Sequence, residues 1–106
     1  MGYIKDVPRR DALNRLKTSR GHIDGIIRMV EDDAYCPEVM KQLSAVQASL
    51  ERVSRLVLRN YLETCVAAAM QAGRTGEIVD ELMEALRYDR VATGPEPVDA
   101  AARNGV

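Results

Sequence analysis

The stretch from about Pro37 to Met70 reads as one uninterrupted helix, and this long element limits the possible folds more than any other feature. One apolar strip along it alternates four and three residues apart, the spacing of a coiled-coil seam. That strip comprises Val39, Leu43, Val46, Leu50, Val53 and Val57. A second strip comprises Leu56, Leu58, Leu62, Val66 and Met70. Because a helix that is apolar on more than one side packs against more than one neighbour, this helix should lie at the centre of an assembly.

Two shorter helical patterns flank the long one. The first covers about residues 7–31, and its apolar face is formed by Leu13, Leu16, Ile23, Ile27 and Val30, with Ile26 beside them. Its two glycines, Gly21 and Gly25, share one face, which suggests that another backbone approaches closely there. The other pattern covers about residues 77–89, after a break at Gly73 and Gly76. With no Trp, no Phe and 4 Tyr, the core must be aliphatic, so we predict an all-α fold with three helices per chain.

The length of 106 residues indicates one domain with a limited core of its own, so oligomerisation is expected. Residues 1–90 should form a single helical domain. Residues 91–106, rich in Ala, Gly, Pro and Val, should form a disordered tail. No apolar run resembles a signal peptide or a membrane span, so the chain is expected to be cytoplasmic, without a membrane partner.

The net charge of −1 hides a basic beginning and an acidic end. Residues 1–28 carry seven basic side chains against three acidic ones, whereas residues 77–106 carry three against seven. On the long helix, Arg52, Arg55 and Arg59 form a stripe. Arg15, Lys17 and Arg20 could join it from the first helix to build a broad basic face. A solvated face with local ion pairs, such as Glu51–Arg55, is the other interpretation. No zinc finger, helix-turn-helix or basic-zipper motif is present, so any contact with DNA must use helical faces of an oligomer.

Two cysteines lie at opposite ends of the long helix. Cys36 and Cys65 are 29 residues apart, which is roughly 43 Å along one continuous helix. Two chains packed antiparallel would bring Cys36 of one beside Cys65 of the other, making two sites per dimer. Tyr61 lies one turn before Cys65 and would border the same site. Alternatively, both cysteines are small buried apolar residues. Catalysis is not expected, since the single histidine, His22, lies mid-helix and no oxyanion-hole motif is visible.

Several runs of residues resemble the copper-sensitive operon repressor family (CsoR) over about residues 9–90. They are Leu13–Lys17, Arg20–Ile26, Tyr35-Cys36, Gln42–Gln47 and Leu62–Cys65. The resemblance implies antiparallel dimers that assemble as a dimer of dimers, bind operator DNA when free and release it when the inducer binds. It also implies operator contacts for Arg15, Arg52 and Arg55.

Copper-sensing members of that family hold Cu(I) with Cys, His and Cys across the subunit interface. The two cysteines match Cys36 and Cys65, but Tyr61 occupies the His position. The family's supporting Tyr and Glu correspond to Tyr35 and Glu81. Nickel and cobalt sensors use an N-terminal His that is absent here, and formaldehyde sensors lack the second Cys. The persulfide-sensing branch keeps both cysteines and lacks the His, which is the arrangement in this chain.

A phenol with a pKa of about 10 is a hard oxygen donor and suits Cu(I) poorly, whereas thiol chemistry needs no third ligand. The favoured hypothesis is therefore a repressor, with no cofactor, that releases its operator when the Cys36/Cys65 dithiol reacts with persulfide or other reactive sulfur species. The alternative is a Cu(I)-sensing repressor that binds the metal through the same two thiolates. An alternative of another class is a thiol-dependent metal-binding or chaperone protein with no role on DNA.

Overall fold

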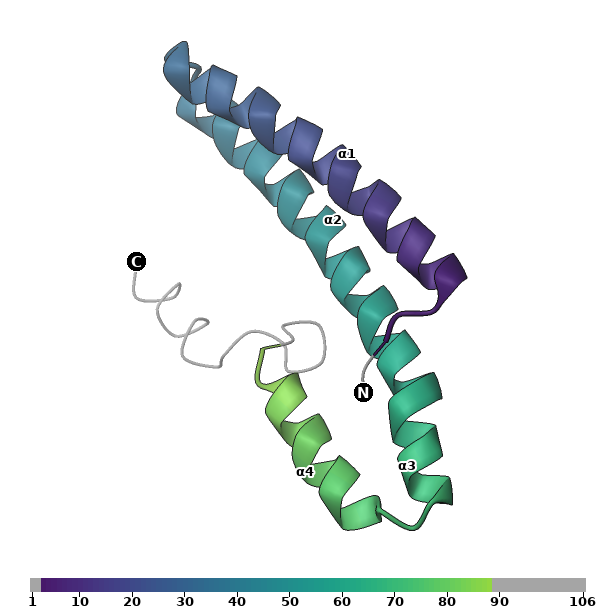
Figure 1. Ribbon diagram of the computed structural model, residues 1–106. Helices are drawn as coiled ribbons and strands as arrows, with labels where there is room; N and C mark the ends of the chain where they lie inside the picture. The colour runs from purple at the N-terminus through teal and green to yellow at the C-terminus, as the bar shows by residue number, and fades with distance from the viewer. Residues whose placement is uncertain (1–2, 89–106) are drawn as a thin grey trace, which may run out of the picture.

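The computed structural model describes residues 3–88, and all regular structure within them is helical (Figure 1). Helix α1 spans Asp6–Glu31 and α2 spans Cys36–Tyr61. The chain then continues through a π-helical turn, η1, at Leu62–Val66, and into α3 at Ala67–Gln71. Helix α4 spans Thr75–Leu86. The backbone at both junctions of η1 is α-helical, so α2, η1 and α3 form the single long helix that the sequence predicts.

The all-α fold with three helical units is thus confirmed, with small shifts at the boundaries. The last helix begins at Thr75 and ends at Leu86, earlier at both ends than the predicted range of 77–89. The predicted tail, residues 91–106, lies outside the described residues. Within residues 3–88, no helix combines the length and the apolar character that a membrane crossing demands.

Both long helices end in the same capping arrangement. At the end of α3, Gly73 adopts a left-handed φ of 78° and donates its N–H to the Met70 carbonyl at 3.1 Å. The next N–H, from Arg74, reaches the Ala69 carbonyl at 2.9 Å, which completes a Schellman motif. Asp33 does the same after α1 with a φ of 57°. These caps turn the chain sharply, so α2 runs back along α1 and α4 folds back against α3 (Figure 1).

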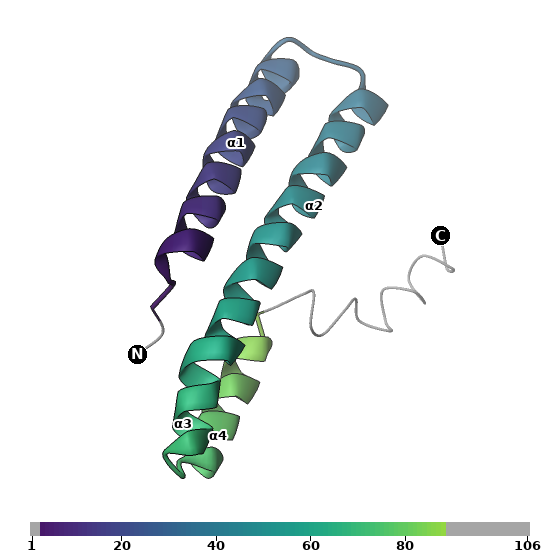
Figure 2. The same ribbon diagram turned by 90° about the vertical axis from the view of Figure 1, so that its right-hand side faces the viewer.

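The contact between α1 and α2 is made by small and polar side chains together with branched apolar ones. The buried residues recur every seven positions on each helix: Ala12, Ser19 and Ile26 on α1, and Val46, Val53 and Asn60 on α2. Two polar pairs also bridge the helices, Ser19–Ser49 at 2.8 Å between hydroxyl oxygens and His22–Gln42 at 2.7 Å between ring nitrogen and amide oxygen. A seven-residue repeat of buried positions on both helices lets them run side by side, as Figure 2 shows.

Most of the larger apolar side chains of α1 point away from α2. Leu13, Leu16, Ile23, Ile27 and Val30, which form the apolar face found in the sequence, are all 41–60 % exposed. On α2, Val46 and Val53 are buried whereas Leu43 and Leu50 of the same strip remain exposed. Ala12, Ser19 and Ile26 are the buried residues of α1, so its other large apolar residues lie outside the hairpin.

The glycines of α1 are also uncovered within the chain. A Cβ at Gly21 would meet no atom within 4 Å, and at Gly25 only the guanidinium of Arg28, at 3.8 Å. The close backbone approach predicted at these two positions is therefore absent inside one chain.

The molecule is thin and long for its size. Its extents are 56 × 38 × 14 Å, and the smallest is little more than the diameter of one helix, about 10–12 Å. Its radius of gyration is 17.8 Å, against the ~13 Å of a compact chain of about 100 residues. One chain is therefore a single layer of helices with much apolar surface uncovered. Its buried cluster, formed by Val66, Ala69 and Ile78 with Tyr61 packed against it, lies where α4 folds back.

Candidate metal and DNA sites

The two cysteines lie at opposite ends of the long helix. Cys36 is the first residue of α2 and is exposed, whereas Cys65 lies in η1 and is half-buried. Because the helix between them is continuous, 29 residues separate the thiols by roughly 43 Å, and those of one chain cannot meet. Within residues 3–88, no group of three potential ligands that could hold a metal ion comes together in the single chain. Any site that uses both thiols must therefore combine two chains.

Cys65 lies within the π-helical turn, which the sequence pattern did not predict. Next to it, the hydroxyl of Thr64 donates to the Asn60 carbonyl at 2.7 Å, and its oxygen is 3.7 Å from the Cys65 sulfur. A π-helical turn inserts one extra residue into a helix, and such turns occur frequently at functional sites.

Tyr61 is bound to Glu81 across the gap between the long helix and α4. Its phenol donates a short hydrogen bond to a carboxylate oxygen of Glu81. Burial raises the pKa of Tyr61 to about 12, with further contributions from the hydrogen bond and charge of Glu81 and from the charge of Cys65. The phenol is therefore neutral at physiological pH, and it donates its proton to the hydrogen bond with Glu81.

Tyr35 and Glu81 lie far apart in one chain, as the two cysteines do. Tyr35 precedes Cys36 at the start of α2 and is 75 % exposed, whereas Glu81 lies on α4 beside the Cys65 end. An arrangement in which both support one site requires two chains.

The segment before α1 lies against the long helix, a contact that the sequence analysis missed. The buried Asn60 accepts the Lys5 backbone N–H at 3.2 Å, and its amide donates to the Tyr3 carbonyl at 2.8 Å. Figure 1 shows this segment crossing the long helix below the α1–α2 hairpin. The available signal was the position of Asn60, seven residues after Val53 in the buried repeat of α2. A buried amide must find partners, and here the chain's own N-terminal segment supplies them.

Four of the five basic residues predicted to contact DNA come together. Arg15 from α1 and Arg52, Arg55 and Arg59 from α2 line one shallow depression with a volume of about 280 Å³. Lys17 is exposed on α1 and is not part of this group. Arg15 pairs with Asp11 at 3.0 Å and Arg59 with Glu63 at 3.3 Å. Among the described residues, Arg52 and Arg55 form no ion pair, and the Glu51–Arg55 pair considered above is not formed.

Residues 8–88 match the sequence model of the family described as metal-sensitive transcriptional repressors. The chain belongs to this family. It is 60 % identical over 88 residues to the copper-sensing transcriptional repressor CsoR of Mycobacterium ulcerans, an alignment that covers 83 % of this chain and 75 % of that protein. It is 55 % identical over 87 residues to CsoR of Mycobacterium tuberculosis, covering 82 % of this chain and 73 % of the relative.

Solved structures of repressors have the same fold. The copper-sensing repressor CsoR with Cu(I) from Geobacillus thermodenitrificans superposes with a TM-score of 0.75 at 32 % identity, covering 82 % of this chain and 91 % of that chain. The nickel-responsive transcriptional regulator InrS superposes with a TM-score of 0.69 at 35 % identity, covering 80 % and 93 %. The resemblance found in the sequence is therefore confirmed.

These relatives bear on the choice between the persulfide-sensing and the copper-sensing hypotheses. They are copper-sensing repressors and a nickel-responsive regulator, and the family is one of metal-sensitive transcriptional repressors. None of these findings supports the favoured expectation of a persulfide sensor without a cofactor. The copper alternative is the better supported of the two.

Proposed function

We propose that this protein is a Cu(I)-responsive transcriptional repressor that binds operator DNA without metal and releases it when Cu(I) joins Cys36 of one chain to Cys65 of another. The observation that carries the proposal is the position of the two thiols at opposite ends of one continuous helix. Antiparallel packing of two such helices pairs the thiols twice, by symmetry. The copper-sensing relatives support the choice of metal.

The proposed ligand set is the two thiolates. Thiolates are soft ligands that select Cu(I), and two are enough for a linear site. Tyr61 does not join them, because its phenol stays protonated and donates to Glu81. The Tyr61–Glu81 bond instead holds α4 beside the helical turn that carries Cys65.

The proposed assembly covers the apolar surface that one chain leaves exposed. The exposed residues of α2, including Leu43 and Leu50, would pack against the second chain of an antiparallel dimer. The exposed face of α1, with Gly21 and Gly25, would pack between dimers in a dimer of dimers. Glycines without a neighbour on their outer side allow another helix to approach closely.

The proposed DNA surface is the arginine group formed by Arg15, Arg52, Arg55 and Arg59, with Lys17 at its margin. Arg52 and Arg55 have no acidic partner in the described chain, so their charge is available to phosphates. Because such contacts release counterions, the affinity should fall steeply with salt.

A mobility-shift assay with the duplex upstream of the protein's own coding sequence tests this function. The reduced protein should shift the duplex, Cu(I) under anaerobic conditions should release it, and Cys36→Ser or Cys65→Ser should retain DNA binding but lose the response. Absence of any shift would favour the metal chaperone instead.

The persulfide sensor remains the second candidate, because Tyr61 leaves the dithiol without a third ligand. Release by an organic persulfide, together with no release by Cu(I), would establish it in place of the copper sensor.

A further inference from the structure

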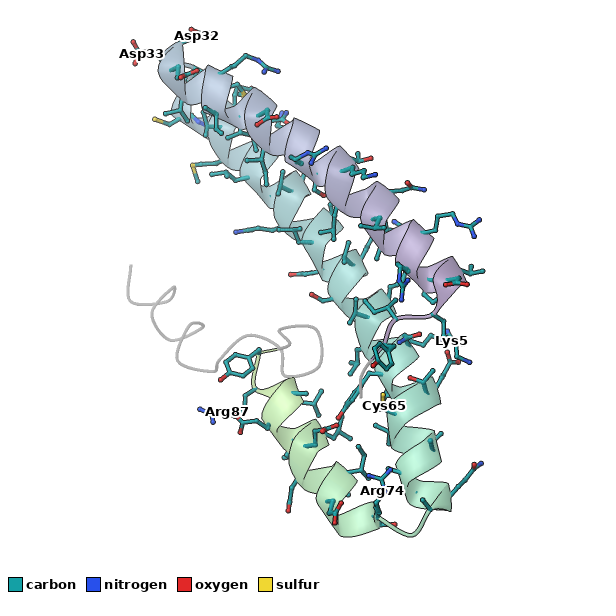
Figure 3. All side chains as sticks on the ribbon, in the orientation of Figure 1. Lys5, Asp32, Asp33, Cys65, Arg74 and Arg87 are labelled. Carbon is teal, nitrogen blue, oxygen red and sulfur yellow. The ribbon has the colours of Figure 1, made fainter. Side chains whose placement is uncertain are left out.

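A cavity of about 400 Å³ opens beside Cys65, at the end of the molecule where the long helix, α4 and the N-terminal segment meet. Its floor is apolar and includes Ala69 and Ile78, two residues of the buried cluster. Two cationic residues, Lys5 and Arg74, and one acidic residue, Glu81, also line the cavity. Figure 3 shows the Cys65 sulfur on the side of the helix that faces α4, with Arg74 between α3 and α4.

The backbone N–H groups of Lys5 and Arg74 are both fixed by hydrogen bonds. The amide of Asn60 binds the chain on either side of Ile4, which brings Lys5 to the rim of the cavity. The Schellman cap of α3 fixes Arg74 through its N–H bond to Ala69. Neither side chain forms an ion pair within residues 3–88, so both positive charges are available to a ligand.

The charge of the cavity is positive on balance. Lys5 and Arg74 oppose the single carboxylate of Glu81, and that carboxylate already accepts the phenol proton of Tyr61. A ligand that suits this site carries a negative group for the two cations and a soft atom for the thiol. Its size is limited to a small organic molecule.

We infer that this cavity recognises the carboxylate of a small anionic thiol, and that Cys65 takes Cu(I) from the complex of such a thiol. The inference rests on the proposed function, in which Cys65 is a copper ligand. In a reducing environment Cu(I) is held by thiolates, because they are its preferred ligands. In the transfer, Cys65 forms a sulfur–copper bond as one bond to the carrier breaks. The proton of the Cys65 thiol passes to the departing carrier thiolate, so no oxidant or reductant is needed.

Charge selectivity at Cys65 tests the recognition step without copper. Reduced protein is alkylated with iodoacetate, which is anionic, or with iodoacetamide, which is neutral, and Cys65 modification is followed by peptide mass spectrometry. The ratio of the two rate constants measures anion preference and cancels changes in general accessibility. In the Lys5→Gln/Arg74→Gln double variant this ratio should fall about three- to ten-fold, the effect of removing two charges near the thiol.

Arg20→Gln is the matched control, because Arg20 is an exposed cation on α1 that does not line the cavity. It should leave the ratio unchanged. The inference is wrong if the double variant keeps the wild-type ratio, or if Arg20→Gln lowers the ratio as much. In the first case the cations do not act at the thiol, and in the second only net charge matters.

A second measurement separates this inference from the proposed function. Cu(I) is supplied as its complex with mercaptoacetate, an anionic thiol, or with 2-mercaptoethanol, a neutral one, and operator release is timed. Wild-type protein should respond faster to the mercaptoacetate complex, and the double variant should respond to both alike. Equal responses in wild type would overturn the carrier inference while leaving the copper sensor intact. No release by either complex would overturn the copper sensor, whereas the alkylation ratio would still report on the cavity.

Discussion

The phenol of Tyr61 donates to the carboxylate of Glu81, and this bond joins the helix that carries Cys65 to α4. Tyr61 packs against the cluster of Val66, Ala69 and Ile78 and is half-buried, whereas Glu81 is exposed. It explains how a tyrosine can border a thiol site without competing for a soft metal. The oxygen that could act as a ligand keeps its proton far above physiological pH.

The first prediction concerns the titration of that phenol. Followed by the ultraviolet absorbance of phenolate, Tyr61 should ionise near pH 12, whereas Glu81→Gln should lower its pKa toward 10. The folded-state pKa is raised, so the associated stability is full below about pH 10 and is lost as the pH rises to about 12. No difference between wild type and Glu81→Gln would mean that the carboxylate does not hold the phenol.

The second prediction concerns the ligand set. Tyr61→Phe removes only the hydroxyl and should leave Cu(I) affinity within about three-fold, because the phenol is not a ligand. Tyr61→His adds an imidazole, a good third ligand for Cu(I), and should tighten binding by at least about ten-fold. Competition with a Cu(I) chelator measures both. A large loss of affinity in Tyr61→Phe would show that the phenol oxygen binds the metal.

The third prediction concerns Asn60. Replacing it with Ala leaves the Lys5 N–H and the Tyr3 carbonyl without their partner, and should lower the free energy of unfolding by about 1–3 kcal/mol. Urea denaturation measures this loss, with the exposed Ser44→Ala as the control. If Asn60→Ala is as stable as the control, the N-terminal segment is not anchored by this side chain.

The fourth prediction concerns the arginine group. Arg52→Gln and Arg55→Gln should each weaken operator binding and reduce the slope of log affinity against log salt by about 1, as expected for the loss of one phosphate contact. Arg28→Gln, at the far end of α1, should change neither quantity. Unchanged slopes in both test variants would place the DNA on another face.

The fold was predictable because helical periodicity and glycine breaks are local signals. The face that α1 presents to α2 was not. The apolar pattern singled out Leu16 and Ile23, but the hairpin instead buries Ala12 and Ser19 together with Ile26. A single sequence does not say which apolar strip is covered within a chain and which between chains.

The candidate site was predictable in part for a similar reason. Cys36 and Cys65 stand out by residue type, and the length of the helix separates them by simple geometry. Residue type alone does not single out Lys5, Asn60 and Arg74. Their positions depend on a long-range contact and on the cap of α3. The π-helical turn likewise leaves no signal in the apolar pattern. It adds one residue to a single turn, and a helix with two apolar strips shows no visible break in spacing at that point.

The measurement that tests the account most directly mixes two defective proteins. Cys36→Ala chains and Cys65→Ala chains are unfolded, combined in equal amounts, refolded together and titrated with Cu(I) in the presence of a competing chelator. Neither variant alone should bind tightly. After random pairing, half of the dimers are mixed, and each mixed dimer has one of its two sites intact, so binding should recover to about a quarter of the wild-type capacity. Tight binding by either variant alone, or no recovery in the mixture, would contradict a site shared by Cys36 of one chain and Cys65 of the other.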